Sequence, residues 1–401
     1  MTQPSNTAML PADVKDRTRE SSKSPTGTPG VGRLVGLDLA RGLAVFGMYA
    51  AHVGPDPSEG GVIGFLMELA HGRSSALFAF LAGFAVVLIT GRSSPKTGRA
   101  GRQAVAKVLI RAMILLALGT ALTMSGTPVE VILAFYGVYF LLVLPLYRLG
   151  TGPLAAIAAG TALVLPQVLY VVQPMFPDRE FPSPGRPDDL VSLLFTGSYP
   201  ALTWIPFVIA GMAVARLDLA ATAVPARLAW AGVALAVIGY GGSWLALHLV
   251  PGALPAIGAS GWGGNPASAW WSDTAGGPSD TPYSLLVASP HSETTLSILG
   301  STGVAIVVVT ACVAATSPFP RLRRLAGPVV AVGSMSLTAY VFHIVGIQLL
   351  GIESLPGSPL HVLVGFVVAV TVCAVLWSRF FSRGPLEWLM AKATGVARHV
   401  R

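Results

Sequence analysis

The chain has 401 residues, of which 53% are hydrophobic and only 11% are charged, and its formal net charge is +8. An ordinary soluble domain is about 25% charged, so this chain has too little polar surface for a soluble fold and must be embedded in lipid. Its basic residues recur in short clusters between apolar runs and form no single patch, so we expect no nucleic-acid partner.

The chain begins with a tail and continues as a series of apolar stretches. Residues 1–33 are rich in Ser, Thr, Pro, Lys and Arg, and we expect a disordered basic tail there. Apolar stretches follow at about 36–54, 74–91, 106–124, 130–148, 153–173, 199–216, 228–250, 295–315, 328–350 and 359–380. Each is close to the ~20 residues that cross the hydrocarbon core. The sequence therefore predicts an all-α, polytopic transmembrane bundle of about ten helices, forming one domain over residues 34–390, with a short tail at 391–401.

The positions of Lys and Arg predict the orientation of this bundle. The tail holds five of them, and two other connections hold Arg92, Lys96, Arg99, Arg102, Lys107, Arg111, Arg321, Arg323 and Arg324. The alternate connections are mainly acidic, with residues such as Asp56, Glu59, Glu68, Asp178, Glu180, Asp188, Asp189, Asp273, Asp280 and Glu293. Because basic loops remain on the inside, we expect both termini in the cytoplasm and the protein in the plasma (inner) membrane.

Six of the seven histidines fall at the outer ends or outer halves of the predicted helices: His52, His71, His248, His291, His343 and His361. Imidazole transfers protons near neutral pH, so histidines gathered at one membrane face would suit a general-base site. His52 and His343 lie within apolar runs, where polar groups are costly and usually line a cavity, so we expect them to be functional. For His71 and His291, function and a simple interfacial position are equally plausible, and His248 and His361 are expected to be interfacial only.

Two arginines lie at helix starts. Arg41 follows Asp38 by three residues on one helical face, which predicts either a local ion pair or a site where Arg41 meets the phosphates of a cytoplasmic cofactor. Arg73 lies in the outer connection before Ser74, where it would bind an acidic group, orient a neighbouring side chain or pair with Glu68.

Motifs of soluble enzymes are missing from the sequence. It contains no P-loop, nucleophile elbow, HExxH sequence or dinucleotide-binding fingerprint, and we predict no metal site. The long outer connections at 174–198 and 251–294 are rich in Pro, Gly, Trp and Asp, and loops of such length are usually functional.

Several segments together resemble one known family. They are residues 37–45 (LDLARGLAV), 52–55 (HVGP), 71–83 (HGRSSALFAFLAG), 197–204 (GSYPALTW), 216–219 (RLDL), 289–292 (SPHS), 336–340 (SLTAY) with His343, and 384–388 (GPLEW). This set resembles bacterial membrane proteins related to heparan-alpha-glucosaminide N-acetyltransferase, and it covers nearly the whole chain except the tail. One departure is that the eukaryotic enzyme has Asn where this sequence has His52.

The resemblance implies a transmembrane acyltransferase. Its co-substrate would be acyl-CoA, with acetyl-CoA as the first candidate, and its acceptor would be an envelope sugar or glycolipid. We accordingly expect His52, His343 and His71 to be catalytic, Arg41 and Asp38 to bind the coenzyme, and Arg73 and His291 to bind the acceptor. Direct transfer and a histidine-linked acyl intermediate both fit these residues. The partners would be membrane lipid and the acceptor, and a homodimer is left open.

Two alternatives come from other functional classes. A proton-coupled transporter or flippase would use the same intramembrane histidines and arginine as a substrate path. A receptor-like binding protein would use the long outer loops. Only the acyltransferase needs acyl-CoA at its cytoplasmic face.

Overall fold

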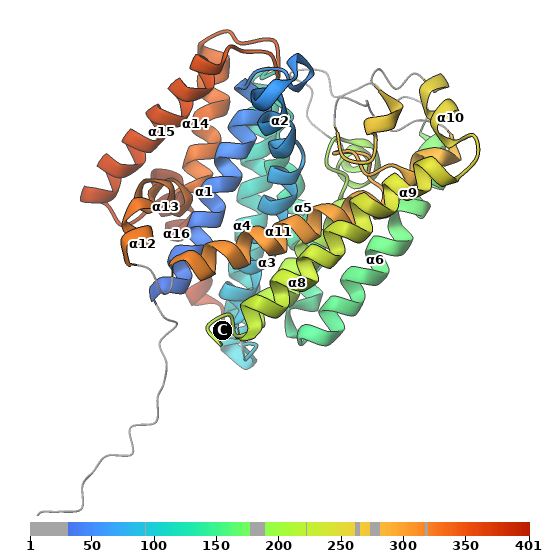
Figure 1. Ribbon diagram of the computed structural model, residues 1–401. Helices are drawn as coiled ribbons and strands as arrows, with labels where there is room; N and C mark the ends of the chain where they lie inside the picture. The colour runs from blue at the N-terminus through green and yellow to red at the C-terminus, as the bar shows by residue number, and fades with distance from the viewer. Residues whose placement is uncertain are drawn as a thin grey trace, which may run out of the picture.

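The structure is a computed structural model that describes residues 31–92, 94–176, 189–221, 223–260, 265–272, 281–316 and 320–401. Within these residues every regular element is a helix, so the predicted all-α class is confirmed (Figure 1). The predicted N-terminal tail lies outside the described residues, except for residues 31–33, where the first helix already begins.

The first half of the chain forms α1 (Val31–Val53), α2 (Gly61–Ala70), α3 (Arg73–Thr90), α4 (Gly98–Met124), α5 (Ile132–Val143), α6 (Thr151–Val172) and α7 (Ala201–Ala215). The second half forms α8 (Ala223–Ala236), α9 (Gly242–Leu249), α10 (Ala253–Ala259), α11 (Thr295–Thr316), α12 (Pro320–Leu325), α13 (Gly327–Ser334), α14 (Ser336–Leu349), α15 (Leu360–Phe380) and α16 (Pro385–Thr394). Single turns of 3₁₀ or π-helix join several of them, such as η2 (Leu144–Arg148), η3 (Gln173–Met175), η5 (Val237–Gly241) and η9 (Gly395–His399).

Six helical segments in the described residues are long and apolar enough to span a membrane. They are Gly61–Thr90, Gly98–Met124, Thr151–Met175, Ala223–Leu249, Thr295–Thr316 and Leu360–Phe380. The pair α13 and α14 would make a seventh, although it bends by 85° at its break. All ten predicted apolar stretches are helical, but α5 and α7 are short, and α1 carries Asp38 and Arg41. A multi-pass membrane protein is therefore supported, whereas a count of ten spans is not established.

Small residues let these helices approach closely. A Cβ added at Gly333 of α13 would overlap the backbone oxygen of Asp38 in α1, and one at Gly83 of α3 would overlap that of Val208 in α7. Such contacts explain why α1 packs on α13 and α3 packs on α7. Close backbone packing stabilises helices in lipid, where apolar side chains gain little by leaving the solvent.

The bundle has two distinct ends. Figure 1 shows the start of α1 and the C-terminus at the same end, which we call the terminal end. α1 finishes at the opposite end, where His52 and Val53 form its last turn, and we call this the histidine end.

Three segments differ from the predicted connections. The first outer connection contains helix α2, and the long connection at 251–294 contains α10. Much of the other long connection, residues 177–188, lies outside the described part of the chain. The segment expected to be a C-terminal tail is helical through His399 and packs on α4, where the Gln103 amide donates to the Arg398 carbonyl at 3.0 Å.

Candidate active site

The histidine end brings together two imidazoles from opposite parts of the chain. His52 in the last turn of α1 and His343 in the middle of α14 share a hydrogen bond of 3.0 Å between Nδ1 and Nε2. Their rings are nearly parallel, with centroids 5.2 Å apart. Tyr49 stacks on the other side of His343, with centroids 4.8 Å apart, and donates its hydroxyl to the Ala339 carbonyl at 2.7 Å. The histidine pair, His52 and His343, thus belongs to a packed aromatic core.

Hydrogen-bond partners assign the protons of this pair. The Nδ1 atom of His343 contacts the Tyr340 carbonyl, which can only accept, so Nδ1 carries the proton. In the neutral ring, Nε2 of His343 must then accept from Nδ1–H of His52. The Nε2 atom of His52 has no hydrogen-bond partner among the described residues, so its lone pair is free there, which is the feature that a general base requires.

His71 lies beside this pair at the turn between α2 and α3. Its Nε2 bonds the Ala51 carbonyl, next to His52, at 3.1 Å, and its buried Nδ1 has no partner among the described residues. The turn depends on Gly72, whose φ of +58° is unfavourable for other residues and whose missing side chain makes room for Pro290. The loop that carries His291 therefore rests directly on the turn that carries His71.

Arg73 is bound by the chain on three sides. Its Nε donates to the Tyr240 hydroxyl at 3.1 Å, Nη1 donates to the Glu68 carbonyl at 2.8 Å, and Nη2 donates to the Trp271 carbonyl. The guanidinium also lies 5.0 Å from the centre of the Tyr240 ring. Nη1 thus bonds the backbone carbonyl of Glu68, and Arg73 ties α3 to the outer loop.

His291 and Glu293 border a small hollow, the glutamate pocket, with a volume of about 20 Å³, which is room for about one water. The His291 ring packs on Tyr199 and Trp204, with centroids 5.4 and 5.8 Å apart. The Glu293 carboxylate accepts from the Trp204 indole at 2.9 Å and from the Thr203 hydroxyl. Burial raises the pKa of Glu293, although these hydrogen bonds and nearby His291 oppose the shift.

A larger cavity of about 270 Å³ lies between the middle of the bundle and the terminal end. It is lined by Arg41, Phe78, Leu81, Ala82, Ala85, Leu88, Ile89, Arg111, Leu115, Leu133, Tyr136, Phe140, Gly333, Ser334, Ser336, Leu337 and Glu387. We call it the arginine cavity. Two guanidiniums on an otherwise mainly apolar wall suit a ligand that is anionic at one end and less polar along its length.

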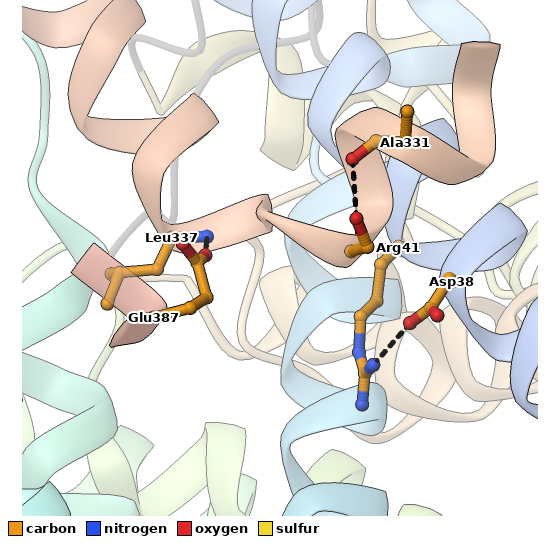
Figure 2. Close-up of polar contacts among 6 residues, drawn as sticks. Asp38, Arg41, Ala331, Leu337 and Glu387 are labelled. Atoms are coloured by element: carbon orange, nitrogen blue, oxygen red, sulfur yellow. Dashed lines mark hydrogen bonds and ion pairs between the residues drawn. The ribbon is translucent and has the colours of Figure 1, made fainter. Parts of the chain in front are cut away.

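The polar rim of this cavity is built by α1 and by the bend between α13 and α14. Arg41 bonds Asp38 at 2.8 Å, so the predicted local ion pair is present, and Arg41 also lines the cavity. Beyond the bend, Glu387 accepts from the backbone N–H of Leu337 at 2.8 Å (Figure 2). It also accepts from the backbone N–H of Thr338 at 3.2 Å. Glu387 thereby caps the first turn of α14, whose N–H groups have no partner within the helix.

The arginine cavity and the histidine pair are joined by one helix. Leu337 lines the cavity and His343 lies six residues further along α14, a rise of ~9 Å. Tyr340 fills the interval: its ring packs edge-on against His343 at 5.0 Å, and its hydroxyl accepts from the Ile132 N–H at 3.2 Å. One turn beyond Ile132, Tyr136 lines the cavity.

The seven predicted site residues therefore lie at four places. His52, His343 and His71 gather at the histidine end, Arg41 with Asp38 lies at the arginine cavity, and His291 lies at the glutamate pocket, while Arg73 braces the outer loop. Sequence reasoning missed Tyr136, Glu387 and Arg111. For Arg111 a signal existed, since it is the fourteenth residue of α4 and falls inside the apolar stretch 106–124, where a charge is costly in lipid.

In the described residues, no group of three or more His, Cys, Asp or Glu side chains is placed to hold a metal ion.

The helical bundle and its internal polar sites define a multi-pass membrane protein with buried acid–base groups. Residues 33–245, more than half of the chain, match the family model described as heparan-alpha-glucosaminide N-acetyltransferase, catalytic, and the chain belongs to this family. This membership indicates a membrane acetyltransferase. Residues 269–397 match a second model, described as a protein of unknown function (DUF418). No curated protein matches the chain.

Proposed function

We propose that the protein is a membrane-embedded acyltransferase of the plasma membrane. It would move an acyl group, with acetyl as the first candidate, from cytoplasmic acyl-CoA to a sugar or glycolipid acceptor on the far side. The terminal end would face the cytoplasm, in agreement with the basic connections found there. The observation that carries the proposal is a histidine pair with one free lone pair, joined through α14 to a cavity that Arg41 and Leu337 line.

The spacing along α1 suits the coenzyme. Arg41 and His52 are eleven residues apart, a rise of ~16 Å. The pantetheine arm of CoA is an extended chain containing two amide bonds. It is about as long as four or five extended residues, which span roughly 15 Å. Phosphates near Arg41 would therefore leave the thioester near His52 once the Tyr340 side chain moves aside.

In this mechanism His52 is the general base and His343 is a positioning residue. The Nε2 atom of His52 takes the proton of the acceptor hydroxyl or amine, and the acceptor oxygen or nitrogen forms a bond to the thioester carbon. The carbon–sulfur bond breaks, and the CoA sulfur leaves with the proton returned by His52. His343 fixes the tautomer of His52, as the Tyr340 carbonyl fixes that of His343. A histidine-linked acyl intermediate would begin with the attack of the same Nε2 atom on the thioester.

Acyl-CoA binding is the first test, because the transporter does not require it. Acetyl-CoA at ~100 times its dissociation constant should stabilise the purified protein by ~2.7 kcal/mol. Arg41→Gln should weaken this stabilisation more than it weakens binding of the acceptor. Arg323→Gln, on the exposed face of α12, is the matched control and should leave it unchanged. If no acyl-CoA shifts the thermal unfolding of the wild-type protein, the acyltransferase proposal fails and transport becomes the better explanation.

A further inference from the structure

Two buried polar atoms, on side chains that line the arginine cavity, lack hydrogen-bond partners among the described residues. They are Nε of Arg111 and the hydroxyl of Tyr136, and both remain unpaired among the described residues. Buried donors in folded proteins are nearly always satisfied, so an orphaned one needs an explanation. Here the two side chains come from α4 and α5 respectively and line the same cavity.

Burying Arg111 without a partner costs more free energy than burying the Tyr136 hydroxyl, because Arg111 is charged. It stands in the middle of α4, where a guanidinium without a partner is strongly unfavourable in lipid. Among the described residues, the cavity lining includes one carboxylate, that of Glu387. It already accepts three hydrogen bonds from the first turn of α14. Two come from the N–H groups of Leu337 and Thr338, and one comes from the Thr338 hydroxyl. Among the described residues no ion pair connects Glu387 with Arg111, and Asp38 bonds Arg41.

Tyr136 supplies a neutral donor further along the wall. Its ring stacks on Phe78, with centroids 5.7 Å apart and planes only 10° from parallel, so the phenol has a fixed direction. The side chain is 3% exposed, and apolar residues such as Leu133 and Phe140 surround it in the cavity lining. A hydroxyl held in this way can donate to an uncharged carbonyl, whereas a charged group is better served by Arg111.

We propose that Arg111 and Tyr136 are ligand contacts of the arginine cavity: Arg111 binds a phosphate, together with Arg41, and Tyr136 donates to a carbonyl oxygen of the same molecule. The ligand is therefore an amphiphile that carries both groups. Acyl-CoA carries phosphate in its pyrophosphate and carbonyl oxygens in its amides and thioester. The choice of acyl-CoA as the ligand rests on the proposed function. A phospholipid has both groups in its phosphate and ester carbonyls, so the experiment must separate the two sources.

The test uses the full-length protein in phosphatidylcholine nanodiscs and three probes: acetyl-CoA, pantetheine without phosphate, and added phosphatidylglycerol. Arg111→Gln should raise the Kd for acetyl-CoA by tenfold or more and leave that for pantetheine unchanged. Tyr136→Phe should raise the Kd for both by about fivefold, because both carry the carbonyl groups. Neither variant should lower the melting temperature of the ligand-free protein, since neither removes a bond within the described residues.

Matched controls come from residues of the same type that are bound by the chain. Tyr139 donates its hydroxyl to the Tyr199 carbonyl at 2.6 Å, and Arg92 donates to the carbonyls of Ala215 and Leu217 at 3.1 and 2.8 Å. Tyr139→Phe and Arg92→Gln should therefore lower the melting temperature and leave every Kd unchanged.

The outcomes separate this proposal from the proposed function. If acetyl-CoA binds but its Kd is the same in wild type and Arg111→Gln, the contact assignment is overturned and the acyltransferase proposal survives. If phosphatidylglycerol binds in an Arg111-dependent manner and acetyl-CoA does not bind at all, the contacts stand and the ligand is a lipid. If both variants lose stability as the controls do, Arg111 and Tyr136 are structural and the proposal fails.

Discussion

Arg73 and His343 at the histidine end differ from Arg111 and Tyr136 in the arginine cavity in their hydrogen bonds to the chain. At the histidine end, Arg73 donates to three oxygens of the chain, and His343 is held by both His52 and the Tyr340 carbonyl. In the arginine cavity, Nε of Arg111 and the hydroxyl of Tyr136 have no partner among the described residues. The first region resembles a preorganised catalytic site, whereas the second has the unmet hydrogen-bonding capacity of a binding site.

This contrast has a physical meaning for mutations. A group that the chain already satisfies contributes to folding, so its removal should destabilise the protein. A buried group without a partner opposes folding, and its removal should stabilise the ligand-free protein and weaken binding. The predictions below test this division, beginning with the largest effect.

Replacement of His52 should have the largest effect on turnover. His52→Ala removes the proposed general base and should slow acyl transfer by ~10²–10⁴-fold, with little change in the Kd for acetyl-CoA. The measurement is the rate of acetyl transfer, with acetyl-CoA binding followed separately by thermal shift. His343→Ala should also lose most of the rate, because His52 then lacks the neighbour that fixes its tautomer.

His248 offers a matched control for the histidine pair. It lies on α9, where its Nδ1 bonds only the carbonyl of Trp244, at 2.7 Å, one turn back in the same helix. His248→Ala should keep the wild-type rate. Near-normal activity of His52→Ala would disprove its role as the base and leave His343 as the candidate.

Two arginine substitutions should change stability in opposite directions. Arg73→Gln breaks bonds to Tyr240, Glu68 and Trp271 and should destabilise the protein by about 1.5–3 kcal/mol. Arg111→Gln removes a buried charge whose Nε has no partner among the described residues, and it should raise the melting temperature of the ligand-free protein. Both are measured by thermal unfolding without ligand. Equal losses of stability would abolish the distinction between the two regions.

The sequence predicted the helical class well, because lipid leaves few other ways to satisfy a backbone. Each of the ten apolar stretches is helical. Hydropathy could not predict the 85° bend between α13 and α14, since Val332 to Leu337 is apolar enough to continue a helix. The bend becomes possible because Glu387, fifty residues after Leu337, caps the new helix start, and such a long-range contact leaves no local pattern.

The position of a polar residue within an apolar run was the signal that singled out two histidines, and the structure brings these two together. His52 and His343 were predicted to be functional because they interrupt apolar runs, and the structure places them in contact, although their catalytic role is still a proposal. Arg111 carried the same signal but was counted with the basic connection before it. Tyr136 gave no signal, because a tyrosine in an apolar run looks like ordinary core, and only the cavity reveals its unpaired hydroxyl.

The smallest predicted effect concerns Glu293, the buried carboxyl group at the histidine end. Burial raises its pKa above the ordinary 4.5, so the folded protein holds this proton more tightly than the unfolded chain does. Stability should therefore fall as the pH rises from about 4.5 through the raised pKa. Glu293→Gln keeps an oxygen for the Trp204 indole and cannot ionise, so its melting temperature should lack this decline. His291, the titratable neighbour, is present in both proteins, and its contribution cancels in the comparison. Parallel pH curves would mean that the Glu293 carboxylate is already well solvated, and the glutamate pocket would then be open to water rather than part of the packed histidine end.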